Sequence, residues 1–257
     1  SVWHFIPMEK CRGAETITIE LTHYFSNGSF QLDAPYLDTT SAIQHTLIEQ
    51  NSLVITFCAI CILLTFGLFI CGAVLYRWRS GAHLQLLALA TFVALSGLWV
   101  LLDAKILNIF GGNLALTYFL NYAAFLLLPV PFLLYIRFVA SEGQRILTAL
   151  IWVALANAVL SMLICLSGIA TIGATLFSIH ALIILSMLAA IWTFLRNKAW
   201  RRGSDLRFTF FGMLLISACV LVSLVFFYLR GFNTSSASAL YPLGLSLLFI
   251  FMAVDAL

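Results

Sequence analysis

The sequence predicts an all-α membrane bundle of seven transmembrane helices, preceded by strands of a truncated extracellular β domain. Hydrophobic residues make up 63% of the 257-residue chain and charged residues only 9%, which lies outside the range of soluble domains. Most of the chain falls into seven apolar stretches, each near or above the roughly 20 residues that a helix needs to cross a bilayer. These stretches are Ser52–Tyr76, Leu84–Leu102, Leu114–Ile136, Ile146–Leu166, Ile172–Leu195, Phe208–Leu229 and Ala239–Leu257.

The distribution of Lys and Arg predicts how the bundle is oriented. Nine cations follow the first, third and fifth stretches, whereas the opposite loops hold only Lys105 and Arg230. Short loops rich in Lys and Arg stay in the cytoplasm, so we expect the amino terminus outside and the carboxyl terminus inside. The net charge of +3 therefore reflects membrane topology and does not indicate a nucleic-acid partner. The nine cations are Arg77, Arg79, Arg137, Arg145, Arg196, Lys198, Arg201, Arg202 and Arg207.

Residues 1–40 have a different pattern. Apolar and polar residues alternate along Thr16–Thr22, which is typical of a half-buried strand, and Ser26–Ser29 supplies an Asn-Gly turn. Two or three strands cannot form an independent core in water. Since this segment has no initiating Met or leader, we expect it to be the end of a larger exported β domain.

The segment 41–51 is predicted to be a juxtamembrane helix. Thr39, Thr40 and Ser41 are residues that cap helices, and the apolar positions that follow run directly toward the first stretch. A continuous helix there would couple the outer domain mechanically to the membrane domain, residues 52–257. We expect a cytoplasmic domain after the seventh stretch, because no polar anchor follows it.

Three stretches of the chain are similar to one family. Ser96–Asp103, Tyr118–Tyr122 and Leu128–Phe132 resemble the second and third spans of the bacterial seven-transmembrane receptors with diverse intracellular signalling modules. This resemblance implies that residues 1–40 end an extracellular β-sandwich sensor domain with an unknown small-molecule ligand. It also implies a bacterial cell (plasma) membrane location and a cytoplasmic output domain in the same parent chain. That domain is most commonly a diguanylate cyclase of the GGDEF type, and less often a histidine kinase or phosphatase.

Five residues are candidates for ligand binding or coupling, because polar groups inside membranes are often functional. Asp103 lies one turn beyond Trp99, so the two share a face that could line an outer cavity; the alternative is a carboxylate in interfacial water. Asn121 can bridge neighbouring helices. His180 lies in the outer half of the fifth stretch, either as a hydrogen-bonded packing residue or in a coupling role. Asp255 is either an interfacial carboxylate or a sensor of bundle rotation.

Two prolines interrupt the third stretch. Pro129 and Pro131 lack backbone N–H donors, so they are expected to kink the helix and free carbonyl groups. The kink is either purely structural or a hinge for signal transmission.

No catalytic, metal or cofactor site is expected within these 257 residues. Cys58 and Cys61 share a helical face, but the other ligands of a zinc site are missing, so we interpret them as small packing residues. Haem binding is not expected, because His83 and His180 lie at different membrane depths. Ser96 lies in mid-helix, without the glycine-framed loop of an intramembrane serine protease.

The sequence thus favours a sensor and signal-transmission module over an enzyme. The alternative is a transporter or channel of ions or small solutes, which would favour internal repeats and charges near the membrane midplane. The expected partners are the lipid bilayer, the extracellular ligand and the cytoplasmic output domain. The oligomeric state is left open, a homodimer included.

Overall fold

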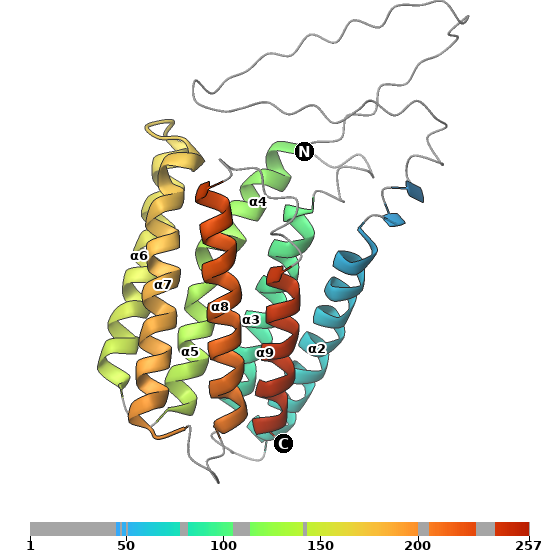
Figure 1. Ribbon diagram of the computed structural model, residues 1–257, viewed down its shortest axis with the longest axis vertical. Coiled ribbons are helices and arrows are strands. Elements are labelled where there is room, and N and C mark those ends of the chain that lie inside the picture. The colour runs from blue at the N-terminus through green and yellow to red at the C-terminus, as the bar shows by residue number, and fades with distance from the viewer. Residues whose placement is uncertain are drawn as a thin grey trace, which may run out of the picture.

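The computed structural model describes residues 45–46, 48–49, 51–77, 82–104, 114–140, 143–199, 206–229 and 240–256, and every regular element in these ranges is a helix (Figure 1). The strands predicted within residues 1–40 lie outside the described residues. The helices are α2 (Ser52–Arg77), α3 (Ala82–Asp103), α4 (Leu114–Leu127), α5 (Pro129–Val139), α6 (Gln144–Leu166), α7 (Ile172–Arg196), α8 (Arg207–Leu229) and α9 (Leu240–Ala256).

Among the described residues, six of the predicted crossings are present as helices that are long and apolar enough to span a bilayer. The third of them, Leu116–Val139, combines α4 and α5. The seventh stretch forms α9, whose 17 residues extend about 26 Å at 1.5 Å per residue, slightly less than the hydrocarbon thickness. The structure therefore confirms a helical, multi-pass membrane protein, and the seventh crossing stays a prediction.

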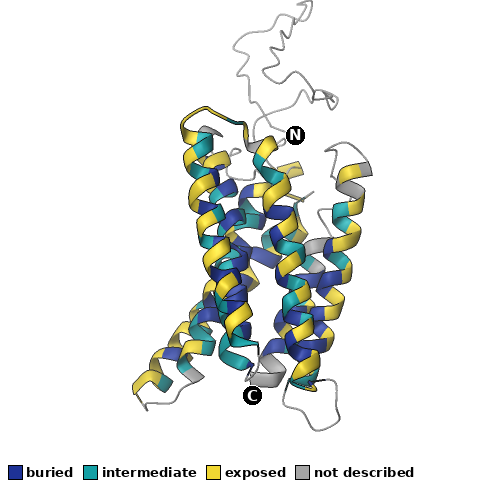
Figure 2. Cartoon of the chain, turned by 90° about the vertical axis from the view of Figure 1, so that its left-hand side faces the viewer, coloured by how far each residue is buried: buried dark blue, intermediate teal, exposed yellow. Residues whose placement is uncertain are grey.

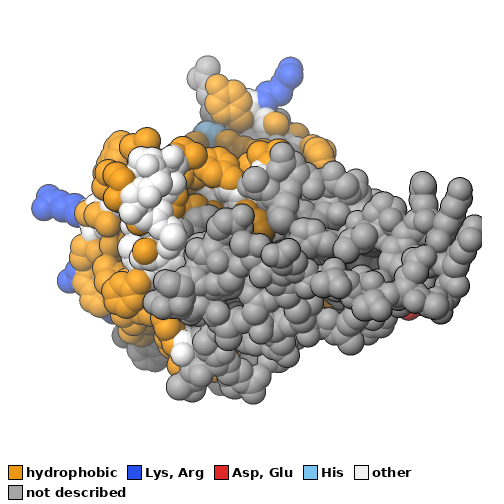
Figure 3. All heavy atoms as spheres, turned by 90° about the horizontal axis from the view of Figure 1, so that it is seen from above, with side chains coloured by type: hydrophobic (Ala, Val, Ile, Leu, Met, Phe, Trp, Pro, Cys, Tyr) orange, Lys and Arg blue, Asp and Glu red, His pale blue; other side chains and the backbone are white. Residues whose placement is uncertain are grey.

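The outer surface of the described bundle is apolar. Leu53, Leu63 and Phe66 on α2 are 81%, 73% and 65% exposed. Exposing such large apolar side chains costs free energy in water but not in hydrocarbon. Exposed positions lie on the outside of the helices and buried positions between them (Figure 2). Hydrophobic side chains also dominate the visible rim of the described part seen from above (Figure 3). The bilayer is the medium in which these side chains are stable.

Most buried apolar residues in the described ranges belong to two packed clusters. The larger one joins residues of α2, α3, α5, α6, α7, α8 and α9, and the smaller one joins α4, α6 and α7. From the third span, Tyr122 and Leu126 belong to the smaller cluster, whereas Phe132 and Leu133 belong to the larger one. The division falls at Leu128, between α4 and α5. The two halves of this span therefore pack in different environments.

Glycine allows α2 and α3 to approach closely. A side-chain Cβ on Gly97 would lie 2.7 Å from the Cβ of Cys61, and the thiol of Cys58 is 3.5 Å from the Gly97 carbonyl oxygen. Cys58 and Cys61 are 6% and 1% exposed, and both are free thiols. Both are buried, as expected for small packing residues, and the structure places them against Gly97 of α3.

Candidate functional site

A row of four rings crosses the bundle from α3 to α8. Trp99 stacks on Phe125 of α4 with ring centroids 5.2 Å apart, and Phe125 meets the edge of His180 of α7 at 5.8 Å. The His180 ring in turn lies 5.8 Å from the ring of Tyr228 of α8, and its Nδ1 is 3.0 Å from the Tyr228 hydroxyl. We name Trp99, Phe125, His180 and Tyr228 the ring row. These contacts link α3, α4, α7 and α8 through aromatic rings.

Asp103 and Asn121 extend the ring row toward the end of the bundle. The Asn121 Nδ2 donates to the Asp103 Oδ1 at 3.4 Å, which links α4 to α3. Asp103 follows Trp99 by four residues, and Asn121 precedes Phe125 by four, so each pair occupies one helical face. The buried Oδ1 of Asn121 has no hydrogen-bond partner among the described residues. A buried amide oxygen without a hydrogen bond costs free energy, so a movement of the neighbouring side chains that brings a hydrogen-bond donor to it would be stabilising.

A second polar contact anchors the same helix. The Tyr122 hydroxyl hydrogen-bonds the Thr175 Oγ1 of α7, and the Cys165 thiol of α6 lies 3.8 Å from each of these oxygens. Tyr122 is 5% exposed, so its hydroxyl needs a protein partner. Through these bonds and the ring row, α4 contacts polar or aromatic groups of α3, α6 and α7. It is thus linked to three neighbouring helices at this end of the bundle.

The proline break lies directly below this anchored helix. Helix α4 ends at Leu127 and α5 begins at Pro129, while Leu128 keeps helical dihedral angles of −53° and −41°. The Leu128 N–H donates to the Phe125 carbonyl at 3.4 Å, a long three-residue bond in place of the regular four-residue one. Neither Pro129 nor Pro131 can donate to the preceding turn. The backbone thus stays helical at Leu128, while the regular hydrogen bonding is weakened at this point; the kink expected from the two prolines stays a prediction.

The structure brings together four of the five residues that the sequence selected as coupling candidates. Trp99, Asp103, Asn121 and His180 lie within one assembly, whereas Asp255 lies in the last turn of α9. Sequence reasoning missed Phe125 and Tyr228, because an aromatic residue in an apolar span carries no signal until its neighbours are known.

The geometry of Ser96 and His180 does not form a catalytic pair. The Ser96 side chain is fully buried, and its Oγ has no hydrogen-bond partner within the described part of the chain. His180 is 8% exposed and pairs with Tyr228 instead. Nor do three His, Cys, Asp or Glu side chains lie close enough to hold a metal ion in the described ranges. The predicted absence of catalytic and metal sites stays a prediction.

All Lys and Arg residues in the described ranges lie at one end of the bundle. This is the end where α2, α5 and α7 terminate and where α3, α6 and α8 begin (Figure 1). Asp103 belongs to the opposite end, together with the ring row. The cations are Arg77, Arg137, Arg145, Arg196, Lys198 and Arg207.

Comparisons of the chain with protein-family models, curated proteins and solved structures find no match. The resemblance to bacterial seven-transmembrane receptors therefore stays a prediction.

Proposed function

We propose that this chain is the signal-transmitting membrane module of a receptor. In this proposal α9 completes a bundle of seven crossings, the end that carries the cations faces the cytoplasm, and the amino terminus is outside. The concentration of the described Lys and Arg residues at one end supports this orientation. The module couples an extracellular ligand domain to a cytoplasmic output domain in a bacterial plasma membrane, with a GGDEF diguanylate cyclase as the first candidate for that output.

One observation carries the proposal: a continuous row of contacts joins α3, α4, α7 and α8 above a weakened point in the third span. Contacts through Phe125 and Asn121 fix α4 to its neighbours, and the break at Leu128 separates it from α5. Helix α5 packs against α3, α6 and α7 in the other half of the bundle. A shift of α4 can therefore change the packing of α5 without unfolding either helix.

Helical structure before α2 supports an input from the outer domain. Residues 45–46 and 48–49 are helical, with His45 and Glu49 3.6 Å apart on one exposed face. Asn51 forms a turn, and its carbonyl accepts the Ile55 N–H at 3.0 Å. A domain attached to this segment acts on α2, and α2 packs closely on α3, the helix that carries Trp99.

The test compares two tryptophan substitutions by hydrogen exchange in a reconstituted bilayer. Trp99→Ala removes the first member of the ring row, and Trp152→Ala removes an equally large side chain that is 67% exposed on α6. We expect Trp99→Ala to change the rate of amide hydrogen exchange in α5 and near Arg196, at the far end of the bundle. Trp152→Ala should leave these exchange rates unchanged. A coupling of about 1–3 kcal/mol corresponds to a 5- to 150-fold change in the opening equilibrium. Changes confined to α3 and α4 would contradict long-range transmission.

A second experiment addresses the receptor itself. A flexible Gly-Ser linker between Gln50 and Asn51 should abolish the response of the full-length receptor to its external ligand and leave membrane insertion intact. A full response with the linker in place would disprove rigid transmission through this junction. Flux of ions or small solutes through the purified chain in liposomes would instead establish the transporter alternative.

A further inference from the structure

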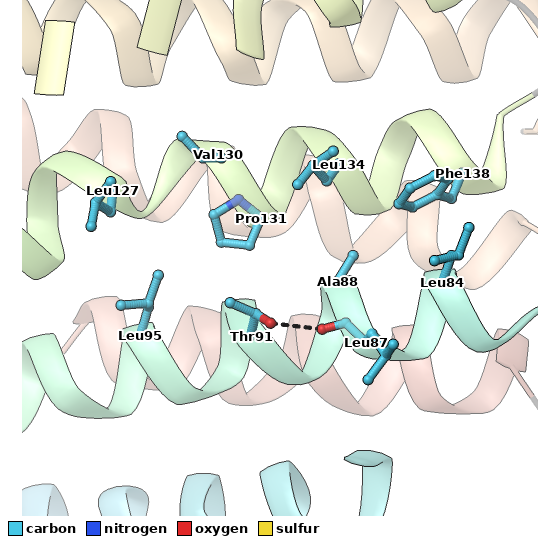
Figure 4. Close-up of a pocket in the computed structure, with 10 residues that line it drawn as sticks. All are labelled: Leu84, Leu87, Ala88, Thr91, Leu95, Leu127, Val130, Pro131, Leu134 and Phe138. Carbon is cyan, nitrogen blue, oxygen red and sulfur yellow. Dashed lines mark hydrogen bonds between the residues drawn. The ribbon is translucent and has the colours of Figure 1, made fainter. Parts of the chain in front are cut away.

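An apolar groove runs along the outside of the bundle between α3 and the third span. It has a volume of about 350 Å³ and is only partly enclosed; its lining residues are drawn in Figure 4. The lining side chains come from α3 and from both sides of the proline break, and Pro131 lies opposite Thr91 in Figure 4. They are Leu84, Leu87, Ala88, Thr91 and Leu95 of α3, and Leu127, Val130, Pro131, Leu134 and Phe138 of α4 and α5.

The lining offers almost no polar group to an occupant. Thr91 contributes the only hydroxyl among the ten lining residues, and it donates to the Leu87 carbonyl of its own helix at 2.8 Å. An occupant therefore gains contacts with apolar side chains alone over most of the length of the groove. Hydrocarbon fits this chemistry, and a water-soluble ligand does not.

The length of the groove matches one leaflet of a bilayer. Leu84 and Leu95 mark its two ends on α3, and eleven residues of helix extend about 16–17 Å. Half of the hydrocarbon thickness is about 15 Å. A transmembrane helix of a second copy would need a contact surface along the full hydrocarbon thickness. An acyl chain from one leaflet needs a groove only half as long.

A cation flanks the end of the groove that lies nearest the membrane surface. Arg137 directly precedes Phe138 and follows Val130 by seven residues, which is about two helical turns, so it lies next to Val130 at the edge of the face of α5 that lines the groove. The Gln85 amide donates to the Phe138 carbonyl at 3.0 Å and links α3 to α5 near this end of the groove. A guanidinium at this depth can pair with a lipid phosphate.

We propose that this groove binds an anionic phospholipid, with one acyl chain between α3 and α5 and the phosphate at Arg137. The site lies in the half of the bundle that carries the cations. Its inner end touches Leu127, Val130 and Pro131, so the bound chain contacts residues on both sides of the α4–α5 break. Occupancy of the groove therefore favours the arrangement of the break that fits the acyl chain.

The experiment uses phosphatidylglycerol with a photoreactive group in its acyl chain, and the full chain reconstituted in phosphatidylcholine vesicles. Labelled positions are mapped by mass spectrometry. We expect labels to concentrate on α3 and α5 at the groove, and unlabelled phosphatidylglycerol to compete about fivefold better than phosphatidylcholine, the factor that one surface cation contributes. Arg137→Gln should remove that preference while keeping the labelled positions.

A matched pair of substitutions tests the location. Thr91→Phe places a large ring in the groove. Val153→Phe places the same ring on the exposed face of α6 and serves as the control. The two positions are matched, because each lies nine residues after the first residue of its helix. We expect the first to abolish groove labelling and the second to leave it unchanged.

Three results would overturn the assignment. If α2 and α6 were labelled as strongly as the groove residues of α3 and α5, the labels would report only a general lipid shell. Equal competition by the two lipids would disprove the role of Arg137. Crosslinks between two protein copies along the groove would identify a dimer interface instead. The unsubstituted protein gives these three answers even where Thr91→Phe fails to fold.

Discussion

Gly97→Ala is expected to separate α2 from α3 and to destabilise the bundle. The added Cβ would lie 2.7 Å from the Cys61 Cβ, which is closer than side-chain carbons approach in proteins, and Cys61 is only 1% exposed. Neither atom is the end of a flexible side chain, so one backbone must move. Overpacking of this kind costs about 1–3 kcal/mol.

The chain contains a matched control for this substitution. Gly67 lies in the interior of α2, and a Cβ there would meet nothing within 4 Å. Gly67→Ala should therefore leave stability unchanged or raise it by up to about 1 kcal/mol through lower backbone entropy in the unfolded chain. Cys61→Gly combined with Gly97→Ala should restore much of the lost stability, because it removes the clashing atom.

The assay is reversible unfolding in bicelles, with the free energy of unfolding measured for each variant at one lipid composition. If Gly97→Ala and Gly67→Ala had equal stability, the close approach of α2 and α3 at this point would be wrong. Rescue by Cys61→Ser, which keeps the Cβ, would likewise show that the clash is not the cause.

Three further predictions concern the ring row, the topology and the proline break. A double-mutant cycle with Tyr228→Phe and His180→Phe should give a coupling of about 0.6–1.7 kcal/mol in unfolding experiments, the range of hydrogen bonds within membranes; independent effects would exclude an energetically important bond. Labelling from outside the cell should reach a cysteine probe at Ser29 and miss one at Gly203, and the reverse pattern would invert the orientation. Pro131→Ala restores an N–H donor, so the amide at position 131 should be protected from hydrogen exchange and stability should rise by about 1 kcal/mol. A rapidly exchanging amide there would show that proline does not cause the break.

Several elements could be predicted from the sequence because their physical cause is local. Helix α3 could be located because a crossing needs a long apolar run, and the position of the break because Pro129 and Pro131 lack donors wherever they occur. The shared face of Trp99 and Asp103 followed from helical periodicity alone. The contact of Asp103 with Asn121 could not be predicted, since it depends on how α3 pairs with α4.

The sequence by itself determined that this is a helical membrane protein, where its helices run, and that its described cations gather at one end. Only the tertiary structure decided which side chains meet: the ring row from Trp99 to Tyr228, the anchoring of α4, and the groove beside Arg137. The reason is physical. Lipid tails are as apolar as a packed interior, so hydrophobicity marks the length of a span but does not mark the face that turns toward its neighbours.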